Sequence, residues 1–146
     1  MKLKVSDVVN IYKPLNTSKL TKMESADKFK VLKAMRAMKP IADEWDSFIT
    51  TIDSKLQGEN HEEIIEKVKK WESEGENTTL TLKERSEINA YLMKLNKEKN
   101  ECTKDELNKE VEIEFEKLNK SAFEKFIESN DLEVNTMIAI EAVLCE

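Results

Sequence analysis

Apolar residues along positions 31–56 are separated alternately by four and by three residues. They are Val31, Met35, Met38, Ala42, Trp45, Ile49, Ile52 and Leu56. Because an α-helix has about 3.6 residues per turn, this spacing places all of them on one face of a long helix. Leu32, Ile41 and Phe48 widen the stripe, which favours a helix packed in a globular bundle over a bare two-stranded coiled coil. We therefore expect a long helix over about residues 22–56.

Pro40 lies in the middle of this helix. Proline has no backbone N–H, so it removes one hydrogen bond from the helix interior. We expect the helix to be kinked or divided there.

A second long helix is predicted after residue 81. Thr81 and Glu84 have the spacing of a capping box at its start. Its buried face is expected to hold Ile88, Leu92, Leu95 and Cys102. This face can pack antiparallel on the 22–56 helix, because bundle helices joined by short connections are usually antiparallel neighbours.

Shorter helices are predicted around these two. Near the N-terminus, Ser6 can cap a helix whose length Pro14 limits. Asn60 and Glu63 resemble a capping box for a helix over 60–72, which Gly75 ends. The apolar face of that helix is Ile64, Ile65, Val68 and Trp71. The C-terminal part has two short helices divided at Asn130–Asp131.

The stretch EVEIEFEKL, residues 110–118, alternates glutamates with apolar residues. A period of two is typical of a strand, and a lone strand is unstable because its backbone groups lack partners. We expect it to pair with Lys2–Val5, where Lys2 and Lys4 can face the glutamates. The alternatives are pairing with Leu80–Leu82 or with a strand of another molecule.

These elements predict a mainly α fold. It is a helical bundle with two long antiparallel helices, shorter packing helices and a minor two-stranded β element, in a single domain over residues 1–146. A chain of 146 residues can bury a substantial core. The presence of only two glycines and two prolines argues against a turn-rich sandwich, a glycine-rich phosphate loop or a flexible linker.

The net charge of −6 argues against binding to nucleic acid or to an anionic membrane surface. Only two of the 24 basic residues are arginines, Arg36 and Arg85, so the usual bidentate reader of phosphate and guanine is scarce. The N-terminal stretch lacks the apolar run of a signal peptide, and no stretch has the roughly 20 apolar residues of a membrane span. We expect a cytoplasmic protein.

Motifs for metal or acid–base chemistry are incomplete. The stretch beginning at His61 starts like the zinc motif HExxH, but Ile65 replaces the second histidine and the chain has no other. A calcium loop from Asp131 would need Gly and Glu where Thr136 and Ala142 stand. Carboxylate pairs are numerous because the chain has 30 acidic residues, and solvated helix faces explain them. We expect no metal, no cofactor, no small-molecule substrate and no enzymatic activity.

Three stretches of the sequence together resemble a known family. They are MKLKVSDVVNIYKPLN at 1–16, FKVLKAMRAMKPIADEWDSF at 29–48 and LNKEVEIEFEKLNKSAFEKF at 107–126. The chain resembles a small uncharacterised protein family of tailed phages and prophages, whose members share a similar start, a proline-interrupted Lys/Ala-rich helix and a late EVE strand. Relative to shorter members, residues 58–81 look like an insertion. The resemblance implies a phage or mobile-element origin and transfers no functional residue.

We therefore expect a non-enzymatic protein that acts through protein–protein contacts, with another protein or by self-association, as a minor virion or assembly component. The alternative is a small regulatory adaptor or inhibitor of a host or phage enzyme, and an enzyme ranks last. Aromatic residues and methionine are enriched at protein interfaces. The predicted interface residues are Trp71, Phe115, Phe123, Phe126 and Met137.

Overall fold

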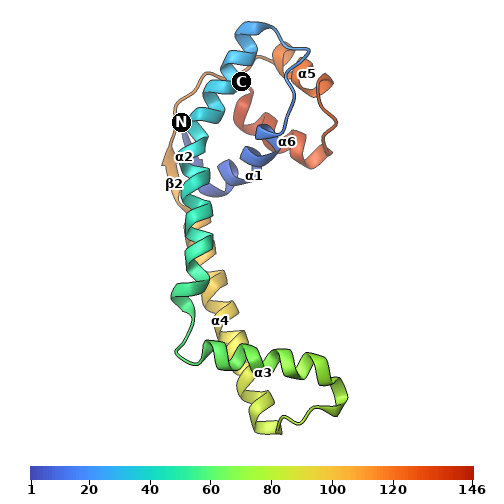
Figure 1. The fold of residues 1–146 in the computed structure, drawn as a ribbon. Helices are drawn as coiled ribbons and strands as arrows, with labels where there is room; N and C mark the ends of the chain where they lie inside the picture. Colours follow the sequence, from blue (N-terminus) through green and yellow to red (C-terminus); the bar gives the residue numbers. More distant parts are fainter. The chain divides into compact units, whose positions relative to one another are not determined.

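The computed structural model describes residues 1–146 and is mainly helical (Figure 1). In chain order the elements are β1 (Lys2–Lys4), α1 (Val5–Asn16), α2 (Ser25–Leu56), α3 (His61–Glu74), the 3-10 helix η1 (Gly75–Asn77), α4 (Leu82–Asn108), β2 (Glu110–Glu112), α5 (Lys120–Glu128) and α6 (Val134–Leu144). The predicted fold, with two long helices, shorter helices and one small β element, is confirmed.

Contacts divide the chain into two compact units. Unit 1 comprises residues 1–47 and 106–146, and unit 2 comprises residues 48–105. Unit 2 is therefore inserted in the sequence of unit 1, and α2 and α4 each contribute residues to both. The single domain and the insertion at 58–81 stay predictions.

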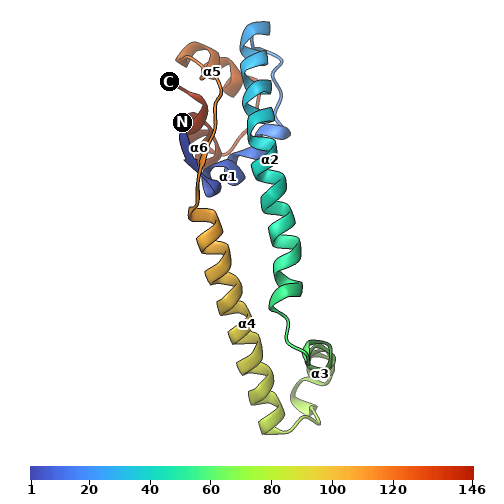
Figure 2. The same cartoon turned by 90° about the vertical axis from the view of Figure 1, so that its left-hand side faces the viewer.

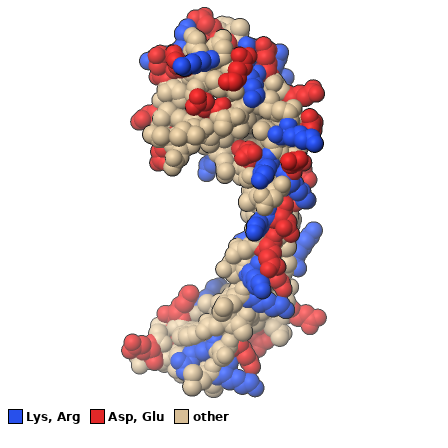
Figure 3. All heavy atoms as spheres, turned by 180° about the vertical axis from the view of Figure 1, so that it is seen from behind, with Lys and Arg blue, Asp and Glu red and all other residues tan.

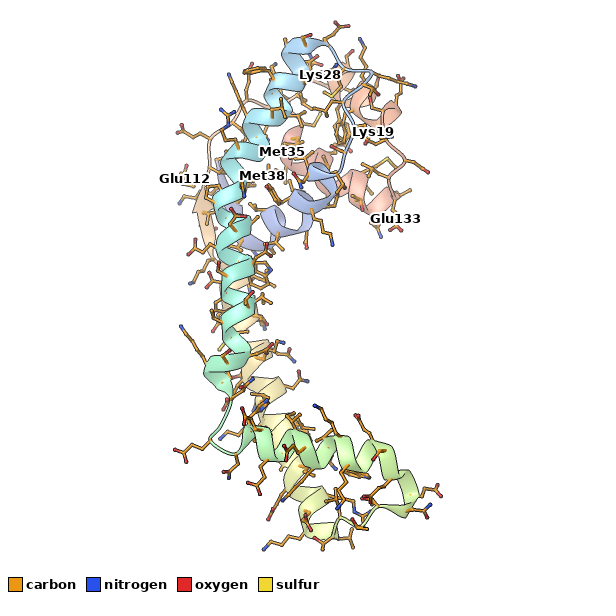
Figure 4. All side chains as sticks on the ribbon, viewed as in Figure 1. Lys19, Lys28, Met35, Met38, Glu112 and Glu133 are labelled. Carbon is orange, nitrogen blue, oxygen red and sulfur yellow. The ribbon has the colours of Figure 1, made fainter.

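Unit 1 contains most of the buried apolar residues. Its fully buried side chains include Val8, Ile11, Leu15, Val31, Met38, Leu118, Phe126, Ile140 and Leu144. Helix α1 packs on α6, and Figure 4 shows Met35 and Met38 on the side of α2 that faces α1. Burying one such side chain stabilises a protein by about 1.5–3 kcal/mol, so unit 1 has a substantial core.

Helix α2 is a single element that runs through Pro40. The seam positions Val31, Met38, Ala42 and Ile52 are buried, as their spacing predicted. Pro40 has no N–H to donate to the carbonyl oxygen of Arg36. Both residues are exposed, so water can donate a hydrogen bond to that oxygen instead. The helix is therefore not divided. The prediction that Leu32 belongs to the buried stripe is wrong, since its residue surface is 49% exposed.

The strands pair antiparallel, as predicted, with Lys2 opposite Glu112 and Lys4 opposite Glu110. The strand at 110–118 is shorter than expected, because β2 ends at Glu112. Beyond it, Leu118 forms an isolated parallel bridge with Cys145. The N- and C-termini consequently lie near each other on unit 1 (Figure 2).

Helix α1 begins two residues earlier than a cap at Ser6 would place it. It starts at Val5, so Ser6 lies inside its first turn. The N–H of Lys4 donates to the carboxylate of Asp7 at 3.1 Å, which satisfies one donor at the helix start. Pro14 lies in the last turn, and the helix continues to Asn16.

Unit 2 consists of the last turns of α2, then α3, η1 and most of α4. Asp53 of α2 pairs with Lys99 at 3.0 Å, and the N–H of Gly58 donates to Tyr91 Oη at 3.2 Å. Gly58 follows Asp53 in the chain, whereas its partner Tyr91 precedes Lys99. The two segments therefore run antiparallel. The buried apolar residues of unit 2 are Ile52, Leu80 and Ile88.

Two details of unit 2 differ from expectation. The side chain of Asn60 makes no capping hydrogen bond at the start of α3. Cys102 is exposed, so its assignment to the buried face of α4 is wrong. Nearby, Thr103 and Glu106 are half-buried. The inward-facing side of α4 therefore passes through Thr103 and not through Cys102.

Candidate functional site

A hollow of unit 2 with mainly apolar lining residues lies between α3 and α4. Its lining residues are Val68, Trp71, Glu72, Gly75, Ile88, Asn89 and Leu92, and its volume is ≈ 300 Å³. We call it the Trp71 groove. That volume is at the lower end for small-molecule sites and gives room for an apolar side chain.

The groove exists because α3 has more apolar surface than unit 2 can cover. Ile64, Ile65, Val68 and Trp71 recur on one face of α3, as predicted, and all four are only half-buried. No residue of α3 is fully buried, and α4 buries only Ile88. An amphipathic helix normally buries this face against a partner element. Helix α3 crosses α4 (Figure 1) and leaves this face partly open.

The turn after α3 fixes the position of Trp71. Gly75 ends α3 with φ of 57°, a conformation that glycine adopts without steric cost. Its N–H donates to the carbonyl oxygen of Trp71. The N–H of Thr79 donates to Glu74 Oε2 at 2.7 Å, which holds the following loop against the end of the helix. Trp71 therefore lies in the last turn of α3, where these two hydrogen bonds define the helix end.

The other end of α3 is attached to α4 through Tyr91. His61 Nδ1 and Tyr91 Oη lie 2.8 Å apart, and their ring centroids are 5.9 Å apart. The same hydroxyl accepts the N–H of Gly58. The only histidine of the chain thus has a structural role at the start of α3.

The start of α4 is capped as predicted. Glu84 N–H donates to Thr81 Oγ1 at 3.1 Å, and Thr81 N–H donates to Glu84 Oε1 at 3.4 Å. The backbone N–H of Thr81 lowers the pKa of Glu84; burial opposes this shift, and the hydroxyl of Thr81 and the ammonium of Lys67 add to it.

Charge is mixed around the groove. Glu72 lines it, and Glu76 is exposed on the adjoining η1. Lys67 lies 3.6 Å from Glu84 and 3.9 Å from Glu63. Figure 3 shows cationic and acidic side chains interspersed on the visible face. Exposed pairs of this kind contribute little to stability.

The five predicted interface residues lie in different surroundings. Phe126 is 0% exposed and Phe123 is buried beside it, with ring centroids 5.9 Å apart, so both fill the core of unit 1 in this structure. Trp71, Phe115 and Met137 are half-buried and retain accessible surface. Only Trp71 lines the groove. The interface role of these residues stays a prediction.

Exposed apolar residues on α2 were missed by the sequence analysis. Phe29 is 61% exposed, and Leu32 lies one turn away on the same face. Lys33 and Arg36 are exposed on this face too, with Lys33 Nζ 5.7 Å from the centre of the Phe29 ring. We call Phe29, Leu32, Lys33 and Arg36 the α2 stripe. The available signal was that Phe29 does not fit the seam that begins at Val31.

A larger and more polar hollow lies on unit 1. It is located between the α1–α2 loop and the α5–α6 turn, has a volume of ≈ 600 Å³ and is lined by Pro14, Thr17, Ser18, Lys19, Glu128, Ser129, Asn130, Asp131 and Leu132. Asn130 closes this region, since its Oδ1 accepts the N–H of Lys19 at 2.7 Å and its Nδ2 donates to Lys19 O at 2.8 Å. No three His, Cys, Asp or Glu side chains are grouped so that they could hold a metal ion.

None of the helices is both long enough and apolar enough to cross a membrane. Comparison with protein-family models, with curated proteins and with solved structures finds no match to this chain. The functional proposal therefore depends on the surface features described above.

Proposed function

We propose that this chain is a non-enzymatic assembly component that acts through protein–protein contacts, in which the Trp71 groove of one copy receives the α2 stripe of another. The observation that carries the proposal is the apolar groove around Trp71. We further propose a phage or prophage origin, on the resemblance of residues 1–16, 29–48 and 107–126, with a minor virion component as the corresponding role.

The two surfaces are chemically complementary. Phe29 and Leu32 are spaced as neighbouring anchors of one helix face, the arrangement by which a helix binds an apolar groove. Trp71 and Ile88 offer the groove an apolar wall and floor. Aromatic anchors of this kind contribute most of the binding energy at many interfaces.

Charge supports the same orientation. The stripe has Lys33 and Arg36 beside its apolar residues, and the groove has Glu72 in its lining with Glu76 next to it. Complementary charges of this kind orient partners more than they add affinity. The contact joins two different surfaces, so it is heterologous and can propagate from copy to copy.

A test uses two variants that each lose one surface. Trp71→Ala removes the groove wall, and Phe29→Ser/Leu32→Ser removes the anchors. We expect each variant alone to lose self-association by about 30-fold in affinity, which corresponds to about 2 kcal/mol for a buried aromatic anchor. Mixed together, they should form a heterodimer, because each supplies the surface that the other lacks. Sedimentation velocity measures all three samples.

Matched controls are available on the same molecule. Val134→Ser/Ile138→Ser removes an equally exposed apolar pair from α6, and Met93→Ala removes an exposed methionine of α4 outside the groove. Both controls should self-associate like the wild type. Failure of the mixed variants to associate, with wild-type association intact, would show that groove and stripe do not bind each other.

The second candidate is a small adaptor or inhibitor that binds one other protein. The exposed glutamates of β2, Glu110 and Glu112, favour it, because like charges make β2 poorly suited to pairing with a second copy of itself. A wild-type chain that stays monomeric and captures a single partner would support this candidate.

A further inference from the structure

The outer edge of β2 has free backbone groups. In an antiparallel pair, residues that exchange hydrogen bonds alternate with residues that do not. Met1 and Ile113 exchange two backbone hydrogen bonds, at 2.9 and 3.0 Å. By this alternation, the pairs Lys2–Glu112 and Lys4–Glu110 are the ones without hydrogen bonds between their backbones. The N–H and C=O groups of these two glutamates therefore point away from β1.

The opposite edge of the sheet is capped at one end. The outward N–H of Lys4 donates to Asp7 Oδ2 at 3.1 Å, and α1 begins at the next residue. A further strand along β1 could not continue past Lys4. The edge of β2 therefore offers more unpaired backbone groups for a further strand than the edge of β1 does.

The two faces of β2 have different chemistry. Glu110 and Glu112 are exposed on the outer face, and the Glu112 side chain points away from the core (Figure 4). Val111 is on the inner face, half-buried and packed against the core together with Leu3. A strand added to this edge would place alternate residues beside the glutamates and the residues between them beside Val111.

The chain already shows which sequence suits β2. Its partner β1 reads Lys2-Leu3-Lys4, with lysines opposite the glutamates and leucine opposite Val111. We propose that the outer edge of β2 binds an extended segment of a partner protein that has Lys or Arg at alternate positions and an apolar residue between them. This inference rests on the proposed role in protein–protein contacts, and it concerns a surface separate from the Trp71 groove.

A second copy of the chain does not suit this edge. Its β1 has one edge on its own β2 and the other capped at Lys4 by Asp7. Pairing two β2 edges would place glutamates opposite glutamates, and like charges directly opposite each other are destabilising. Charge therefore favours a basic strand from a different protein.

The test uses the full chain labelled with ¹⁵N and the end-blocked peptide KVKVK. We expect the amide hydrogens of Glu110 and Glu112 to exchange about fivefold more slowly with the peptide bound, because they become hydrogen-bonded. The end-blocked peptide EVEVE should give no protection. A KVKVK peptide methylated on the backbone nitrogens of its lysines should bind less well, because these N–H groups would face the two glutamates.

Protein variants test the charge component. Glu110→Gln/Glu112→Gln keeps the side-chain shape and should weaken the binding of KVKVK by about fivefold, through loss of two cross-strand ion pairs. Glu124→Gln/Glu128→Gln makes the same change of charge on exposed positions of α5 and should bind like the wild type. Protection of the Ile113 amide, which donates to Met1 O, reports that the sheet itself is intact.

Equal binding of EVEVE, or unchanged β2 amides with shifts at the Trp71 indole instead, would overturn the inference. So would full binding of the backbone-methylated peptide, a result that does not depend on any variant folding. A monomeric chain that binds KVKVK at β2 would refute self-assembly and leave this inference standing. A chain that self-associates, and in which KVKVK protects neither glutamate amide, would support self-assembly and refute this inference.

Discussion

Thr81 caps the N-terminus of α4 through its side chain, which accepts the N–H of Glu84 at 3.1 Å. Replacing such a cap by alanine leaves one helix donor without a partner. We expect Thr81→Ala to lower the free energy of unfolding by about 1 kcal/mol. The matched control is Thr79→Ala, an exposed threonine in the same loop, which should change it by less than about 0.5 kcal/mol. Urea unfolding followed by circular dichroism measures both, and equal effects would contradict the capping role.

Glu84 makes this capping sensitive to pH. Its pKa is lowered from the ordinary value of 4.5, chiefly by the backbone N–H of Thr81. The folded chain therefore binds this proton less readily than the unfolded chain does. The ionised Glu84 therefore stabilises the folded state fully when the pH is above the ordinary pKa. This stabilisation is lost as the pH falls through the lowered pKa of the folded state. We expect the difference in Tm between the wild type and Glu84→Gln to shrink on acidification to about pH 3, and a constant difference would refute the assignment.

Single residues also show how far the sequence could predict the candidate site. Trp71, one of the predicted interface residues, is half-buried on the apolar face of α3, and its interface role stays a prediction. Phe123 and Phe126 have the same residue character, yet they are buried, because their exposure depends on how α5 meets the remainder of unit 1. Phe29 was missed because the regular apolar spacing begins only at Val31, and the prediction for α2 considered only the buried face that this spacing defines.

Helix α2 continues through Pro40 although proline costs about 3 kcal/mol relative to alanine in a helix interior. The seam residues on both sides of it are buried, and their packing offsets that cost. We expect Pro40→Ala to raise the free energy of unfolding by about 1–3 kcal/mol, because it restores the N–H that donates to the carbonyl of Arg36. Differential scanning calorimetry measures the change. Glu44→Ala, at another exposed position of α2, should have little effect, and a destabilised Pro40→Ala variant would contradict this account.

At the level of elements, patterns that repeat were predicted well. The seam of α2, the cap of α4, the end of α3 at Gly75 and the pairing of β1 with β2 all follow from spacing and charge. Element lengths were predicted less well. Strand β2 ends at Glu112, and backbone pairing continues only to Ile113, which still bonds with Met1. Farther along, Leu118 forms a bridge with Cys145, a contact 27 residues apart in sequence that no local pattern encodes.

The two units differ in how much apolar surface they bury. Unit 2 has Ile52, Leu80 and Ile88 as its buried apolar residues, whereas unit 1 buries most of the others. Regions with few buried apolar contacts open at lower free energy. We expect amides of α3 and of residues 85–100 to exchange through openings at least about 2 kcal/mol lower in free energy than those of α1 and α6. Native-state hydrogen exchange measures this, and equal protection in both units would contradict it.

The same difference explains why the candidate binding surface lies on unit 2. A helix pair that cannot cover its own apolar face gains stability when a partner covers it. The sequence indicated each apolar face separately, but not which of them would be left open, because that depends on the packing of α3 on α4.

The central claim is that the chain assembles with itself through the Trp71 groove and the α2 stripe. Light scattering on a sizing column over a hundredfold range of concentration tests it most directly. We predict a wild-type mass that exceeds 17.0 kDa and rises with concentration, and a Trp71→Ala mass that rises in the same way only at concentrations about 30-fold higher. A wild-type mass of 17.0 kDa at every concentration would contradict the claim and leave the adaptor as the better account.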